Sequence, residues 1–186
     1  DVVVMWGRNT IASEPLLWDW VQKNREKNGA KILCIDPRFS EVAQQADLFL
    51  QLRPGTDAAL ALGMINVIIE EDLYDHDFVE KWTFGFEDLA ERVKEMPPSR
   101  AAEITWIPEE KIVEAARMFA KADRAAVQWG LAVDQTKYSF PTAHAIIDLI
   151  AITGNVDKPG TMTPIFSPYH LDERGASDFD VLTPEQ

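Results

Sequence analysis

The chain has 186 residues, an apolar share of 46% and a single cysteine, so it is long enough to bury one hydrophobic core and cannot form an internal disulfide. Acidic residues outnumber basic ones 31 to 18, and the sequence contains no long basic run. Both features argue against nucleic acid as a partner. No apolar stretch reaches the roughly 18 residues that would predict a membrane span.

The first part of the chain predicts a strand, helix, strand unit. Residues 1–6 form an almost continuous apolar run, which is typical of a parallel strand buried on both faces. A helix capped by Ser13 and ended by Gly29 should follow, and residues 31–35 form a second apolar run. Because the chain already begins on a buried strand, we expect it to be a piece of a larger protein, and the sequence assigns it no cellular location.

The rest of the chain alternates strands and helices. The remaining predicted elements are, in order, a short helix at 42–46, a strand at 47–52, a helix at 57–71, short helices within 73–105, a helix from Pro108, a strand at 124–129 and a helix from about Pro141 to Gly154. This order predicts a doubly wound α/β fold, with a mainly parallel sheet, helices on both faces and a helical insertion around residues 73–105. We assign residues 1–162 to this domain and residues 163–186, which lose periodicity, to a polar tail leading to the next domain.

Open parallel sheets bind ligands beyond the carboxyl ends of their strands, and the first two loops there carry suitable residues. In the first, Gly7 allows close backbone approach and Asn9 offers hydrogen-bonding groups at a helix start. An ordinary glycine turn with a serine cap explains the same residues. Asp36 stands where nucleotide-binding folds hold a ribose hydroxyl pair, and it is equally suited to a turn before Pro37.

The loop at residues 53–57 offers groups for a phosphate and a purine. Arg53 and the amides of Gly55 and Thr56 suit a phosphate, while Asp57 suits the amino and imino edge of a purine. Thr56 and Asp57 are equally typical of helix capping. A fourth loop, at 129–135, contributes the weaker candidate Gln135.

Several common site patterns are absent from the sequence. Gly7 stands alone, outside the Gly-x-Gly-x-x-Gly pattern of NAD-binding folds. There is no Walker loop, no Ser-His-Asp set and no metal-spaced histidine or cysteine cluster, since His76, His144 and His170 are far apart. The sequence therefore predicts no catalytic residue and no metal ligand within this chain.

Four segments follow one another at characteristic intervals. They are Trp6-Gly7-Arg8-Asn9, Ile35-Asp36-Pro37-Arg38, Arg53-Pro54-Gly55-Thr56-Asp57-Ala58-Ala59-Leu60, and Thr153-Gly154-Asn155-Val156 with Pro159-Gly160. In order and spacing they resemble the molybdopterin oxidoreductases of the dimethyl sulfoxide reductase type. The resemblance covers roughly Asp1 to Met162 and includes the stretch from Glu70 to Glu80.

The resemblance implies a central α/β domain that binds one of two molybdopterin guanine dinucleotides around molybdenum or tungsten. The parent enzyme would catalyse a two-electron redox reaction, or oxygen-atom or hydroxyl transfer, on a small-molecule substrate. The metal's protein ligand and an iron–sulfur cluster would lie upstream of Asp1, so the excised chain should be inactive. Its partners would be the rest of the parent chain and an iron–sulfur electron-transfer subunit. The family's cofactor contacts map onto Trp6, Gly7, Arg8, Asn9, Asp36, Gly55, Thr56, Asp57, Leu131 and Gln135.

This chain departs from the family pattern at two points. Relatives usually continue the first loop with Pro and a later Glu-x-His-Pro, so side-chain contacts are not carried over for residues 10–13. Gln135 is followed by Thr136 where His is frequent, so no substrate-side role is carried over for that neighbour. Two other functions stay open. One is a non-catalytic homologue like the large iron–sulfur subunit of respiratory complex I, which the intact first and third loops disfavour. The other is a NAD-type domain, which the lone Gly7 disfavours.

Overall fold

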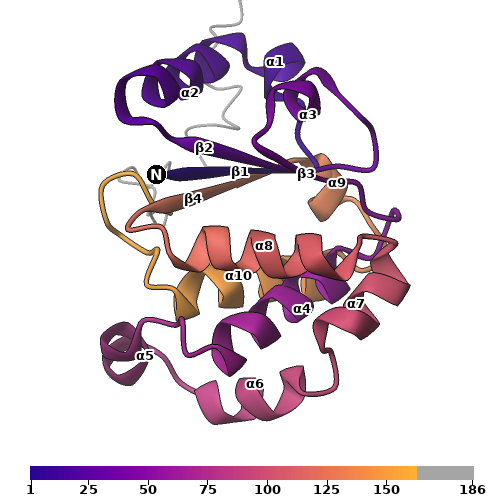
Figure 1. Ribbon diagram of the computed structural model, residues 1–186, viewed down its shortest axis with the longest axis vertical. Coiled ribbons are helices and arrows are strands. Elements are labelled where there is room, and N and C mark those ends of the chain that lie inside the picture. Colours follow the sequence, from indigo (N-terminus) through magenta and orange to yellow (C-terminus); the bar gives the residue numbers. More distant parts are fainter. Residues whose placement is uncertain (163–186) are drawn as a thin grey trace, which may run out of the picture.

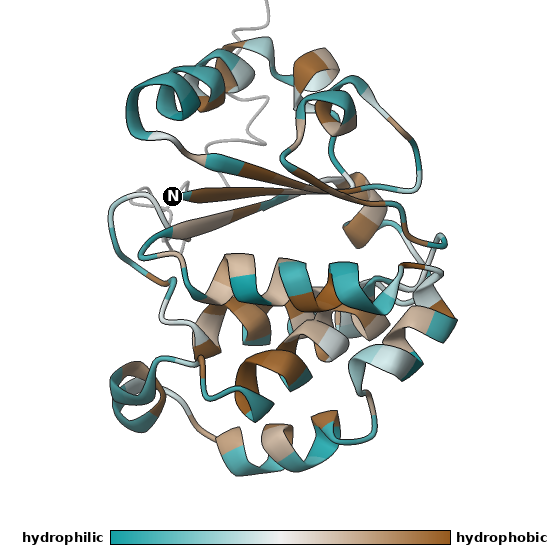
Figure 2. Cartoon of the chain, viewed as in Figure 1, coloured by the Kyte–Doolittle hydropathy of each residue, from teal (hydrophilic) through white to brown (hydrophobic). Residues whose placement is uncertain are grey.

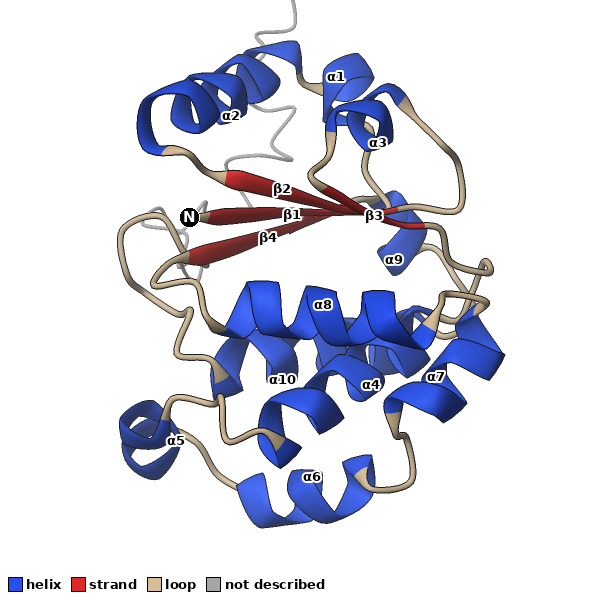
Figure 3. Ribbon diagram, in the orientation of Figure 1, coloured by secondary structure: helices blue, strands red, loops and turns tan. Residues whose placement is uncertain are grey.

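The computed structural model describes residues 1–162, which are built around a four-stranded parallel sheet (Figure 1, Figure 3). Its strands are β1 (Val2–Trp6), β2 (Lys31–Ile35), β3 (Leu48–Leu50) and β4 (Ala125–Trp129). The strand order is β3-β2-β1-β4, and all three pairs are parallel. The chain winds outward from β1 to β3 and then returns to the other side of β1, so the predicted doubly wound α/β fold is confirmed. The predicted tail at 163–186 lies outside the described residues.

Helices cover both faces of the sheet. One face carries α1 (Thr10–Ser13), α2 (Pro15–Asn28) and α3 (Glu41–Gln45) (Figure 1). The other carries α4 (Asp57–Glu70), α8 (Glu109–Ala120) and α10 (Ser139–Ile152). The remaining helices are α5 (His76–Trp82), α6 (Phe86–Val93), α7 (Pro98–Thr105) and α9 (Leu131–Asp134). Helices α5 to α7 are the predicted helical insertion, whereas the sequence did not predict α9.

Most of the core lies between the sheet and α4, α8 and α10, and Figure 2 shows apolar residues concentrated on the strands and these inner helices. The alternation along β1 divides its side chains between two cores. Val4 and Trp6 enter the large core, and Met5 enters a smaller one beneath α2 and α3. Helix α4 packs against α7, α8 and α10, which explains why Leu60, Met64 and its other apolar residues are buried around most of the helix.

The helix prediction after β1 is wrong at its cap. Ser13 belongs to the short helix α1, and its Oγ donates to the backbone oxygen of Asn9 at 3.1 Å. Glu14 then breaks the helix, with φ −145° and ψ 69°, and α2 starts on Pro15. Proline disfavours helical backbone in the residue before it, so Glu14 takes the cap position. The predicted end at Gly29, in the left-handed conformation with φ 71°, is confirmed.

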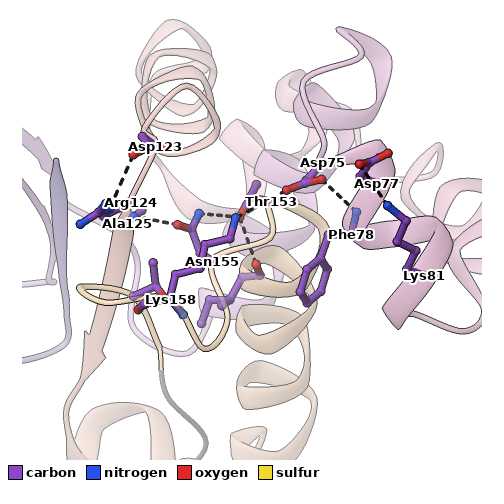
Figure 4. A network of polar contacts seen from close by, with 12 residues as sticks. Asp75, Asp77, Phe78, Lys81, Asp123, Arg124, Ala125, Thr153, Asn155 and Lys158 are labelled. Carbon is purple, nitrogen blue, oxygen red and sulfur yellow. Dashed lines mark hydrogen bonds and ion pairs between the residues drawn. The ribbon is translucent and has the colours of Figure 1, made fainter.

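The Thr153–Val156 segment of the family pattern lies at the amino edge of the sheet, where it ties α10 to β4 (Figure 4). Asn155 is 1% exposed, and its Oδ1 accepts from the amide of Ala125 at 2.7 Å. Its Nδ2 donates to Thr153 Oγ1 at 2.9 Å. Gly154 has φ 62°, and a Cβ there would overlap the Asp75 carboxylate. These residues therefore hold the fold together at the edge opposite the predicted site.

Candidate functional site

The candidate site lies at the carboxyl edge, between β1 and β4. The chain leaves β1 toward α1 on one face of the sheet and leaves β4 toward α9 and α10, so the two loops diverge at the point where the winding reverses (Figure 1). A cavity of about 640 Å³ occupies this crevice. Its lining includes Gly7, Arg8, Asn9 and Glu14 from one side and Trp129 and Leu131 from the other.

Two glycines allow the loops after β1 and β4 to pack closely. Gly7 has φ 58°, and a Cβ there would lie 2.9 Å from Cβ of Ala132. A Cβ on Gly130 would overlap the backbone oxygen of Gly7. The amide of Gly130 donates to the oxygen of Trp6 at 2.9 Å, which extends the strand pairing beyond the strands. Gly7 is therefore required by loop packing, whether or not a ligand also approaches it.

Arg8 crosses the crevice and joins its two walls. Its Nη1 donates to the backbone oxygen of Trp129 at 3.0 Å, and its Nη2 forms an ion pair with Glu14. Its Nε is buried and has no hydrogen-bond partner among the described residues. A buried donor without a partner typically costs about 1–3 kcal/mol. Arg8 thus carries an unmet donor beside the cavity.

Asn9 carries the matching unmet acceptor. Its Nδ2 donates to Glu41 Oε2 at 2.8 Å, while its Oδ1 is buried without a partner in residues 1–162. Hydrogen bonds from the helix backbone and from Asn9 lower the pKa of Glu41 below its ordinary value, so Glu41 stays ionised and holds the Asn9 amide in place. The neighbouring side chains are engaged within the chain, since Thr10 is fully buried with Oγ1 3.3 Å from Met5 Sδ.

Trp6 and Asp57 are joined by a hydrogen bond. Trp6 is 0% exposed, and its Nε1 donates to Asp57 Oδ1 at 2.8 Å. Asp57 is the first residue of α4. Burial raises the pKa of the Asp57 carboxyl, the bond from Trp6 opposes that rise, and the nearby charge of Asp36 adds to it. The buried indole of Trp6 therefore positions the carboxylate of Asp57, and its contact with a cofactor stays a prediction.

Asp36 lies after β2 and is 6% exposed. Its Oδ1 accepts from the amide of Arg38 at 2.7 Å, which is the turn arrangement considered from the sequence. The charge of Asp36 acts on Asp57, so the ends of β1 and β2 and the start of α4 do converge. Its binding to a ribose stays a prediction.

The loop before α4 is open to solvent. Gly55 has φ 80°, and no atom lies within 4 Å of the position of an added Cβ. Thr56 occupies the cap position, but its Oγ1 donates to the oxygen of Arg53 at 2.6 Å instead of accepting from the helix. The first amides of α4 therefore remain available to an anion. The guanidinium of Arg53 lies 5.0 Å from the ring centroid of Trp106.

The two residues predicted in the fourth loop, Leu131 and Gln135, differ in their position relative to the cavity. Leu131 is 66% exposed and lines the cavity, whereas Gln135 is exposed at the end of α9 and is not part of the lining. Sequence reasoning missed Glu14 and Trp129. Trp129 lies in register with Trp6, and its Nε1 donates to Asp134 Oδ1 at 3.2 Å. Its place at the carboxyl end of β4 is the signal that could have identified it.

The described residues contain no group of three or more His, Cys, Asp or Glu side chains placed to hold a metal ion. Within residues 1–162, every helix is too short or too polar to cross a membrane.

Known proteins resemble the chain across most of its length. A family model for "Molybdopterin oxidoreductase" matches residues 1–180. The α subunit of F420-dependent formate dehydrogenase from Methanocaldococcus jannaschii is 38% identical over 183 residues, which are 98% of this chain and 27% of that protein. Formate dehydrogenase H from Escherichia coli is 40% identical over 183 residues, again 98% of this chain and 25% of that protein.

Acetylene hydratases are similar in sequence and in structure. The enzyme from Syntrophotalea acetylenica is 50% identical over 129 residues, or 69% of this chain and 18% of that protein. The solved structure of acetylene hydratase from Pelobacter acetylenicus matches 87% of this chain and 22% of its own, with a TM-score of 0.81 at 42% identity. The aligned parts of the chain thus span between 18% and 27% of the length of these relatives.

Proposed function

The chain belongs to the molybdopterin oxidoreductase family, and from that premise we propose that it binds a molybdopterin guanine dinucleotide in the β1–β4 crevice. The parent would be a molybdenum or tungsten enzyme that holds two such dinucleotides. It would catalyse a two-electron redox reaction, or oxygen or hydroxyl transfer. The names of the relatives, formate dehydrogenase and acetylene hydratase, support small substrates of this kind.

The observation that carries the proposal is the pair of unmet polar atoms on the first loop. Arg8 Nε and Asn9 Oδ1 are a buried donor and a buried acceptor on two residues that line the cavity. A phosphate would satisfy the first, and a hydroxyl or amide donor of a nucleotide would satisfy the second. The cavity of about 640 Å³ is also of the size that cofactors occupy. The residues present therefore fit the group that the family implies.

Several of the predicted residues have a role in this proposal. Arg8 would meet a phosphate, together with the amide of Gly55; the amide of Thr56 is already engaged with the oxygen of Arg53. Asp57 would accept from the amino and imino edge of guanine, and Asp36 from the ribose hydroxyls. The bound group supplies the metal centre for the reaction, while this chain binds and orients it.

Partners follow from the same reasoning. The rest of the parent chain would complete the surroundings of the cofactor, including the metal's protein ligand and an iron–sulfur cluster. Relatives described as α subunits support an additional electron-transfer subunit. Gln135 lies outside the cavity lining, and its contact with the cofactor would depend on how the rest of the parent packs there.

The test is to measure metal and guanine nucleotide in the purified full-length parent by mass spectrometry. Asp57→Ala should weaken guanine retention by on the order of 1–3 kcal/mol, since charge-assisted hydrogen bonds are lost. Asp123→Ala removes an exposed carboxylate at the amino edge and should leave occupancy unchanged. A wild-type parent without metal and guanine would refute the proposal and favour a non-catalytic homologue. Unchanged occupancy in Asp57→Ala would remove Asp57 from the site.

A further inference from the structure

An exposed tryptophan occupies an unusual backbone position next to the loop before α4. Trp106 caps the end of α7 with φ 66°, in the left-handed region where glycine is the usual residue. Its side chain is 69% exposed, so it contributes little to the core. A strained backbone that presents a large aromatic ring to solvent suggests that the ring has a use outside the packing of this chain.

Arg53 covers this ring and is itself held in place. Its guanidinium lies 5.0 Å from the centroid of the indole, a cation–π arrangement that we call the Arg53–Trp106 stack. The amide of Arg53 donates to the oxygen of Thr105 at 2.8 Å, and its own oxygen accepts from the amide and hydroxyl of Thr56. The stack is therefore fixed to the turn that leads directly into Asp57.

We propose that the Arg53–Trp106 stack is a platform for the purine base of the dinucleotide, while Asp57 accepts from the edge of that base. Bases stack on indole rings and on planar guanidinium groups, and such stacking tolerates any base. The edge of guanine that carries its amino and imino donors suits a carboxylate, whereas adenine presents an acceptor at the equivalent ring nitrogen. Stacking would thus supply affinity and Asp57 would supply selectivity. This inference rests on the proposed function of the crevice.

The experiment compares three variants of the full-length parent, Trp106→Gly, Trp106→Ala and Trp106→Phe. The readouts are the guanine nucleotide released per chain by acid hydrolysis and the half-time of its loss on dialysis. The glycine and alanine variants should both lose guanine on the order of 5- to 100-fold faster than wild type, the range expected for one lost stacking contact. The phenylalanine variant keeps a ring and should retain guanine nearly as the wild type does.

The glycine and alanine variants distinguish the effect of losing the ring from the effect of changing the backbone conformation. Glycine removes the ring and relieves the positive φ, whereas alanine removes the ring and keeps the strained backbone. Equal losses in the two variants therefore identify the ring as the cause. The thermal midpoint of Trp106→Gly should equal or exceed that of the wild type. Loss of guanine in only one of the two variants would overturn the platform.

The chain offers a matched control. Trp20 on α2 is 68% exposed and carries Lys23 Nζ 5.2 Å from its ring centroid, so Trp20→Ala removes a similar stack elsewhere and should not change guanine retention. Asp57→Asn is measured in parallel. If Asp57→Asn loses guanine while Trp106→Gly keeps it, the platform is refuted and the proposed function stands. If neither variant loses guanine, the platform is refuted and Asp57 is removed from the site, whereas the proposed function itself fails only if the wild-type parent lacks guanine.

Discussion

The hydrogen bond from Trp6 to Asp57 allows a quantitative test of how the fold prepares the carboxylate for guanine. Trp6→Phe removes the donor and keeps an aromatic ring in the same buried space. Burial raises the pKa of Asp57, and the bond from Trp6 is the main influence that lowers it. Without the bond, the pKa of Asp57 should therefore rise further.

The free energy lost with the hydrogen bond in Trp6→Phe can be judged from the burial of Asp57. A hydrogen bond to a charged group contributes about 1.5–3 kcal/mol, and the partial exposure of Asp57 reduces this to about 1–2 kcal/mol. Asp57 accepts from guanine only when it is ionised, so guanine retention should fall as the pH drops through its pKa. Because that pKa is raised, loss should start above the ordinary aspartate range near pH 3.9, and at a still higher pH in Trp6→Phe.

The assay follows guanine retention by the full-length parent from about pH 4 to about pH 8, across the ordinary and raised range of an aspartate pKa. The smaller ring of Trp6→Phe should also cost about 1–3 kcal/mol of stability through a void, which lowers the thermal midpoint at every pH and is measured separately. Asp57→Asn cannot ionise and should remove the pH shift in both backgrounds. Identical pH profiles for wild type and Trp6→Phe would refute the reasoning.

Three further predictions test the framework around the site. Gly130→Ala should sharply lower both the thermal midpoint and the guanine content of the parent, since its Cβ would overlap the oxygen of Gly7. The control Gly29→Ala has open space at φ 71° and should lower the unfolding free energy by only about 1 kcal/mol. Asn155→Ala should lower the unfolding free energy by about 1–3 kcal/mol, because a buried amide of β4 loses its hydrogen-bond partner. The folded variant should still keep its guanine, and loss of guanine without loss of stability would contradict this. Burial raises the pKa of the Cys34 thiol to about 12, so iodoacetamide should label it only after denaturation, and rapid labelling of the native protein would show that its buried place is wrong.

The strands and the layer arrangement could be predicted because local apolar patterns determine them. The run from Lys31 to Ile35 is a strand with the predicted bounds, and the third strand shortens from 47–52 to Leu48–Leu50. The break at Glu14 escaped prediction although its cause, Pro15, is local, because Ser13 is also a favourable cap. Competing local preferences of similar strength cannot be ranked without the surrounding structure.

The contacts of the site depend on pairing across long stretches of chain. Trp129 joins the cavity because β4 lies beside β1, which places it in register with Trp6 although 123 residues separate them in sequence. The burial of Trp6 depends in turn on α4, whose first residue accepts its hydrogen bond. Asn155 follows a helix that returns from the carboxyl edge to the amino edge, so the topology, rather than its residue type, decides that it stabilises the fold.

The first loop thus contains two kinds of residue. Gly7 and Trp6 are explained by contacts within the chain, because one permits loop packing and the other supports Asp57. Those contacts would persist in a homologue that had kept the fold and lost the ligand. The unpaired atoms of Arg8 and Asn9 differ, since each imposes an energetic cost that nothing in residues 1–162 offsets. These two atoms, more than the glycine, therefore argue that the crevice holds a ligand.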